Sequence, residues 1–344
     1  MTRRNGLWLA AAALCFAMAG WIAQRLATGT GPAGAEPAAG MSPLIRFAAV
    51  GLGPFRGLAG DLLWVRAARL QDDGRYMELV ELSGWIAALQ PHDAGVWTYQ
   101  AWNLAYNISV MFPDPSDRWR WIESGLRLLR DQGLPAAAGE PRMYSELAWL
   151  YTDRVGGQPN DPYAAAYRKI WAERVEASAP GGRVASAAAC QPLGLDLNRV
   201  RILETQTGIL DWRTPEAHAL YWAWQGLRIS GTQRNPMCGR MVLHSLYNLA
   251  HQGRLKRNAT TGEFLASPLP DVWPALIREC ADALAAMASD DPTRSWVGRV
   301  LTEGHRVLND AGRIAAAAEA QGLLKRYFTD GTVQSTQGSQ NGAP

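Results

Sequence analysis

The sequence predicts an all-α protein, in which an N-terminal transmembrane or signal-anchor helix precedes a series of antiparallel helical hairpins. Apolar residues recur at helical spacing through most of the chain, and glycine or proline interrupts them at intervals of one helix length. A long uncharged run stands near the N-terminus. Residues 254–266 instead alternate around a Thr-Gly turn, which predicts one small β-hairpin insertion or an ordered loop.

The N-terminal segment predicts the compartment. Arg3 and Arg4 precede an uncharged run, and its strictly apolar part, residues 7–23, is close to the shortest length that spans a bilayer. The positive charges place the N-terminus in the cytoplasm and the bulk of the chain outside it, in the periplasm or at the cell surface. We favour an uncleaved anchor over residues 1–25. A cleaved signal peptide is the alternative, because Ala33 and Ala35 suit a cleavage site.

The remaining chain divides by composition. A Gly-, Ala- and Pro-rich linker covers residues 26–43, and a small, polar, disordered tail covers residues 330–344. Between them we expect regular helical repeats over 44–178 and a less regular helical region with insertions over 179–329. Helices are predicted over residues 54–74, 75–91, 94–112, 114–133, 140–157, 161–177, 215–229, 237–252, 270–288, 292–310 and 312–328.

The spacing of the large and small residues in these helices repeats. Tyr144, Leu147, Ala148 and Tyr151 match the W-x2-L-G-x2-Y signature with conservative replacements, and a shorter match starts at Trp97. Residues 55–178 therefore resemble a degenerate tetratricopeptide repeat protein. The resemblance implies an α-solenoid whose concave surface binds protein or peptide partners, and it does not imply catalysis.

The repeat geometry assigns different roles to neighbouring aromatic residues. Trp97, Ala101 and Leu104 fall at packing positions, whereas Trp102 falls on the face that would line the concave groove. We therefore expect Trp97→Ala to reduce stability and Trp102→Ala to reduce mainly partner affinity. The alternative is that these aromatic residues are simply core. The candidate groove residues are Trp64, Thr98, Tyr99, Trp102, Arg142, Ser145 and Trp149, with Arg142 available to a carboxylate.

Other chemistries find little support in the sequence. The 34 basic and 31 acidic residues nearly balance, which argues against nucleic acid. No H-E-x-x-H, G-x-S-x-G or P-loop pattern occurs and the histidines do not cluster, so we expect no catalytic residue, no metal and no cofactor. Cys190, Cys238 and Cys280 allow one disulfide, but buried free thiols are favoured because the three are far apart in sequence.

The sequence thus favours a membrane-anchored, extracytoplasmic scaffold that binds a protein or peptide partner, within an envelope assembly. A carbohydrate-binding or carbohydrate-active helical protein is the rival, because aromatic residues stand near Asp114, Asp117, Glu123 and Glu146. A purely structural subunit of a membrane complex is the remaining alternative.

Overall fold

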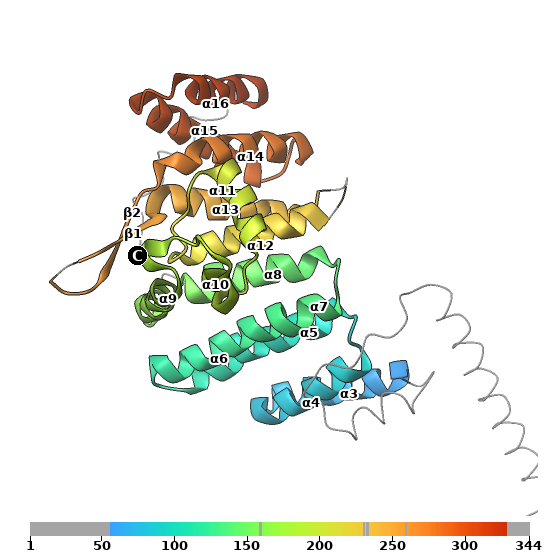
Figure 1. Cartoon of the computed structure of the whole chain (residues 1–344). Coiled ribbons are helices and arrows are strands. Elements are labelled where there is room, and N and C mark those ends of the chain that lie inside the picture. Colours follow the sequence, from blue (N-terminus) through green and yellow to red (C-terminus); the bar gives the residue numbers. More distant parts are fainter. Residues whose placement is uncertain (1–55, 158–159, 230, 232–233, 259, 329–344) are drawn as a thin grey trace, which may run out of the picture. The chain divides into compact units, whose positions relative to one another are not determined.

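The computed structural model describes residues 56–157, 160–229, 231, 234–258 and 260–328 (Figure 1). Over these residues the chain is mostly helical and carries a small two-stranded sheet, which confirms the predicted class and the β-hairpin. The expected anchor, linker and tail lie outside the described residues. Within the described residues, every helix is too short or too polar to span a bilayer.

The chain forms two compact units, one ending at Ala138 and the other beginning at Gly139. The sequence had suggested a change of character later, near residue 178. The first unit begins with the helical pair α3 and α4, whose connecting turn places Gly74 at a φ of +68°. Its helices are α3 (Arg56–Asp72), α4 (Tyr76–Leu89), α5 (Ala94–Trp102), α6 (Pro115–Arg127) and the short α7 (Leu134–Ala136).

Three α-helices, α5, α6 and α8 (Pro141–Leu150), continue directly into π-helical segments, which the sequence did not predict. They are η2 (Asn103–Ile108), η4 (Leu128–Gly133) and, in the second unit, η5 (Tyr151–Val155). A π-turn sends each N–H to the carbonyl five residues back. In an α-helix these N–H groups would bond the carbonyl four residues back. Here side-chain hydroxyls bond two such carbonyls instead: Ser109 donates to Ala105 at 2.6 Å, and Thr152 donates to Ala148 at 3.1 Å.

The core of the first unit has the predicted packing residues at its centre. Trp97, Ala101 and Leu104 are buried, and the indole N–H of Trp97 donates to the carbonyl of Pro91 at 2.8 Å. A Cβ added to Gly125 would lie 2.7 Å from the carbonyl oxygen of Ala101. The small residues on α5 and α6 therefore let these two helices approach closely.

The second unit contains the remaining helices and both strands. Its α11 and the short α10 lie in the stretch that the sequence left mixed; Asp196 caps α11 by accepting the N–H of Arg199 at 2.9 Å. The elements are α8 (Pro141–Leu150), α9 (Ala164–Ser178), α10 (Ala187–Cys190), α11 (Leu197–Thr207), α12 (Pro215–Ile229), α13 (Pro236–Gln252), β1 (Arg254–Arg257), β2 (Phe264–Ser267), α14 (Trp273–Ala286), α15 (Thr293–Asp310) and α16 (Ile314–Tyr327).

The helices of the second unit pack one after another. Helix α12 lies against α8 on one side and α13 on the other, and α14 lies against α13, α15 and α16 (Figure 1). Strands β1 and β2 pair antiparallel, from Arg254 opposite Ser267 to Arg257 opposite Phe264, and project from the helices as an arm.

A buried ion pair fixes the base of this arm. Arg213 donates to both carboxylate oxygens of Asp211, at 2.9 and 2.7 Å, and to Glu176 of α9 at 2.9 Å. The same pair binds the backbone of Leu255 in β1. Asp211 accepts the N–H of Leu255 at 2.9 Å, and Arg213 donates to the carbonyl of Leu255 at 2.6 Å. The hydrogen bonds to Asp211 also raise the pKa of Arg213. Helix α9, the start of α12 and β1 are thereby joined at one point.

Trp97→Ala is expected to lower the free energy of unfolding by about 3–5 kcal/mol, because it removes a large side chain that is 2% exposed. Trp102→Ala, at a side chain that is 41% exposed, is expected to cost less than about 1 kcal/mol. Urea unfolding of the full chain measures both. Equal losses would show that the two tryptophans do not divide into packing and surface roles.

Arg213→Met is expected to cost about 3–5 kcal/mol, because it leaves the buried Asp211 carboxylate without its charged partner. Arg254→Met is the matched control, since Arg254 lies 3.9 Å from Asp271 in an exposed pair and should cost less than about 1 kcal/mol. Urea unfolding followed by far-UV circular dichroism compares them. A loss for Arg213→Met no larger than the control would contradict a central role for the pair.

Candidate functional site

The groove residues predicted in the first unit differ in exposure. Thr98 is buried, with its hydroxyl on the carbonyl of Gly95 at 3.1 Å. Trp64 and Tyr99 are half-buried and meet edge to face, with ring centroids 5.2 Å apart. Their polar atoms contact Gln90 and Gln71 respectively. Trp102 is the exposed member of the set and stacks on Tyr106 at 5.2 Å.

The groove residues predicted in the second unit lie on α8. Ser145 is buried and donates to the carbonyl of Arg142 at 2.8 Å. Arg142 is exposed and lies 4.0 Å from Glu146, while the ring of Trp149 is 45% exposed. Each set is described within its own unit, and the binding of a partner by either set stays a prediction.

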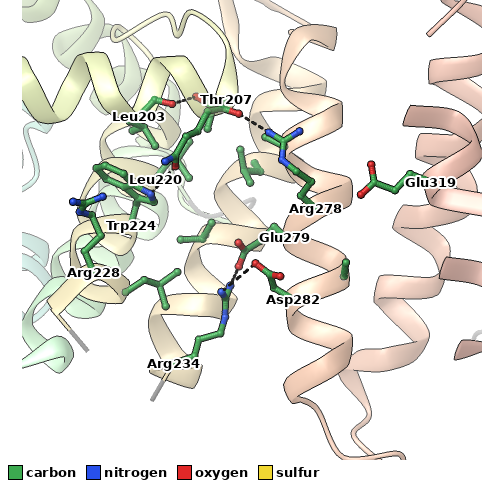
Figure 2. Close-up of a pocket in the computed structure, with 16 residues that line it drawn as sticks. Leu203, Thr207, Leu220, Trp224, Arg228, Arg234, Arg278, Glu279, Asp282 and Glu319 are labelled. Atoms are coloured by element: carbon green, nitrogen blue, oxygen red, sulfur yellow. Dashed lines mark hydrogen bonds and ion pairs between the residues drawn. The ribbon is translucent and has the colours of Figure 1, made fainter. Parts of the chain in front are cut away.

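A cleft of about 520 Å³ lies elsewhere in the second unit, among α11, α12, α13, α14 and α16 (Figure 2). This volume falls within the range of about 300–1,000 Å³ that is typical of ligand sites. Its lining residues are Leu203, Gln206, Thr207, Leu220, Trp224, Leu227, Arg228, Arg234, Val242, Leu246, Ala275, Arg278, Glu279, Ala281, Asp282 and Glu319.

Gln206, at the end of α11, links two walls of the cleft. Its side-chain oxygen accepts the indole N–H of Trp224 from α12 at 3.1 Å. Its backbone carbonyl accepts Nη2 of Arg278 from α14 at 2.7 Å. A cation near the last carbonyls of a helix also opposes the negative end of the helix dipole. The end of α11 therefore spans from α12 to α14 and closes one end of the cleft.

Opposite charges meet at the other end of the cleft. Arg234 points between Glu279 and Asp282 of α14, forms an ion pair with Glu279 and lies 3.6 Å from Asp282 (Figure 2). Partial burial lowers the pKa of Arg234, and the charge of Asp282 opposes that shift. Glu279 and Asp282 thus have a cationic partner within the cleft, and Glu319 of α16 is a third carboxylate in its lining.

Two further arginines are not matched in this way. The guanidinium of Arg228 lies over the ring of Trp224, 4.8 Å from its centroid, and Arg278 contacts the backbone of Gln206. Across the described part of the chain, no ion pair joins Arg228 or Arg278 to a carboxylate. The cleft therefore combines an apolar floor with arginines that can still bind an anionic group.

This cleft is not predicted by the sequence. Its clearest local signal was Trp224 four residues before Arg228, a spacing that places both on one helix face. That pair alone does not indicate a site, because the other walls come from residues as distant as Leu203 and Glu319. Helix α11, which closes one end, was not predicted.

The carboxylates that the carbohydrate alternative would need have local contacts instead. Asp114 caps α6 by accepting the N–H groups of Ser116 and Asp117, which holds the pKa of Asp114 below its usual value. Asp117 and Glu123 pair with arginines on the same helix, Arg120 and Arg127. Burial raises the pKa of Glu146, and nearby Arg142 opposes that shift.

Within the described residues, Cys190, Cys238 and Cys280 are free and buried, as favoured from the sequence. Burial raises the pKa of Cys238 to about 11 and that of Cys280 to about 12, so both stay protonated thiols near neutral pH. Among the described residues, no group of histidine, cysteine, aspartate and glutamate is placed to hold a metal ion.

One histidine joins two helices of the second unit. Nε2 of His251 on α13 lies 2.9 Å from Glu303 on α15, and its Nδ1 lies 2.8 Å from the carbonyl oxygen of Tyr247. Partial burial disfavours the charged ring, but these two contacts and the Glu303 charge outweigh it and raise the pKa of His251. Both ring nitrogens face oxygen acceptors, so the contact is strongest when His251 is protonated.

No protein-family model, curated protein or solved structure matches the chain.

The stabilising effect of His251 is expected to depend on pH. A raised folded-state pKa gives stability that is fully present below the unfolded value, about pH 6.5, and is lost as pH rises through the folded value. The urea midpoint of the wild type should exceed that of His251→Gln at about pH 6, and the gap should narrow by about pH 8.5. His305→Gln is the control, since its Nδ1 contacts the backbone carbonyl of Ala317. A gap that stays constant with pH would be the opposing result.

Proposed function

We propose that this protein is a membrane-anchored, extracytoplasmic helical scaffold that holds a protein or peptide partner. The observation that carries the proposal is the cleft of about 520 Å³ in the second unit, with its apolar floor and charged rim. Protein interfaces typically bind through a few side chains seated in such pockets, surrounded by polar groups that set orientation.

The arrangement of the helices supports a scaffold more than an enzyme. The serial packing of α12 to α16 is the kind expected of an α-solenoid, and the resemblance to tetratricopeptide repeats adds to this interpretation. In this proposal, the arginines and carboxylates at the rim of the cleft orient the segment that binds there. A carbohydrate-active site would instead need two carboxylates that face each other across a cleft.

The compartment in this proposal rests on the N-terminal sequence. Arg3 and Arg4 before an apolar run orient residues 1–25 as a signal anchor, which would leave both units outside the cytoplasm. The linker of residues 26–43 would then give the units reach from the membrane.

Leu227→Asp is expected to abolish partner recovery, because it places a charge in the apolar part of the cleft, where Leu227 is half-buried. The experiment is affinity capture of the full chain from detergent-solubilised membranes, with captured proteins identified by mass spectrometry. Affinity should fall by roughly 10- to 100-fold, as for other central interface positions.

Leu265→Asp is the matched control, because Leu265 is 54% exposed on β2, away from the cleft. Circular dichroism and thermal unfolding check that both variants fold. The proposal fails if no protein is enriched with the wild type, or if Leu227→Asp and Leu265→Asp retain the same partner equally.

A further inference from the structure

The floor of the cleft is apolar and comes from several helices. Leu203 of α11, Leu220 of α12 and Leu246 of α13 are buried beneath it, and Leu227 lies half-exposed at its side. Because those three leucines are already buried, a bulky apolar side chain that entered here would bury its surface against Leu227, which favours binding by roughly 25 cal/mol per Å². One part of the occupant is therefore apolar.

The rim of the cleft has more free cationic than free anionic capacity. Glu279 and Asp282 already face Arg234. Of the other charged residues that line the cleft, Arg228 and Arg278 contact an aromatic ring and a backbone carbonyl, and Glu319 is the one carboxylate. A guanidinium has five N–H donors, and the structure shows one hydrogen bond from Arg278 within the described residues. Another part of the occupant is therefore an oxygen anion.

Helix α11 forms one end of the cleft. Its buried residues Leu203 and Thr207 line the cleft, while Arg199 and Arg201 stay exposed. At its end, the carbonyl of Gln206 supplies the oxygen that Arg278 binds. An occupant beside α11 would repeat this combination of apolar side chains and an oxygen acceptor.

We propose that the cleft binds a segment of a partner protein in which an acidic side chain stands beside bulky apolar residues. The apolar residues lie on Leu227, and the carboxylate binds Arg278, with Arg228 as a second contact. This inference rests on the proposed function and names the chemistry of the partner at the same site.

The test uses the full chain in detergent micelles and an array of short synthetic peptides. Each peptide carries leucine or phenylalanine beside one variable position, which is Asp, Glu, Asn, Gln or Lys. Peptides with Asp or Glu should be retained over their Asn, Gln and Lys counterparts. The affinity of the best peptide, measured by fluorescence polarisation, should fall with added salt because the charges are partly exposed.

Arg278→Gln should weaken the best acidic peptide about tenfold and leave its amide counterpart unchanged, because the variant removes a charge-assisted hydrogen bond. Arg228→Gln should have the same effect to a smaller degree. Arg306→Gln is the matched control: Arg306 is an exposed arginine on α15 that does not line the cleft, so binding should not change. Arg278→Lys, which keeps the charge, should restore part of the affinity.

The inference is overturned if acidic, neutral and basic peptides bind equally, if Arg278→Gln weakens all peptides alike, or if no peptide binds. The scaffold proposal is judged separately, by capture with Leu227→Asp and Leu265→Asp. A partner lost with Leu227→Asp but insensitive to Arg278→Gln would leave the scaffold in place and remove the acidic specificity.

Discussion

The second unit depends on the buried pair of Asp211 and Arg213. Without these charges, the backbone N–H and carbonyl of Leu255 would be buried without polar partners, at a cost of about 1–3 kcal/mol each. The pair satisfies both groups and also binds Glu176 of α9. One contact thus sets the start of α12 against α9 and against the arm formed by β1 and β2.

Once α12 is held at its start, its faces have different neighbours. His218 and Trp222 meet the rings of Tyr151 and Tyr144 on the side of α8. Gly226 lies close to Cys238 of α13. The edge that carries Trp224 and Leu227 is left for the cleft, and the end of α11 covers only part of it (Figure 2). The cleft exists because α11 ends at Thr207 and the row of helices continues beyond it.

The local elements were largely predictable, since each depends on residues close in sequence. The limits of α12, the hairpin at 254–267 and the caps at Asp114 and Gly74 follow from spacing and turn chemistry. The π-helical segments were not predictable, because their apolar spacing differs little from that of an α-helix over a single turn. Helix α11 was missed because its apolar stripe is short and follows an irregular stretch.

The cleft was not predicted, because the apolar groove that the sequence predicts, with Arg142 at its edge, consists of other residues. The sequence by itself determined the helical class, the hairpin and buried positions such as Trp97, because neighbouring residues encode these features. The anchor over residues 1–25 stays a prediction from the same kind of local pattern. The tertiary structure alone decided which arginines keep free donors and where a cleft opens. Those properties depend on contacts between α11, α12, α14 and α16, whose residues are too far apart in the chain for local spacing to relate them.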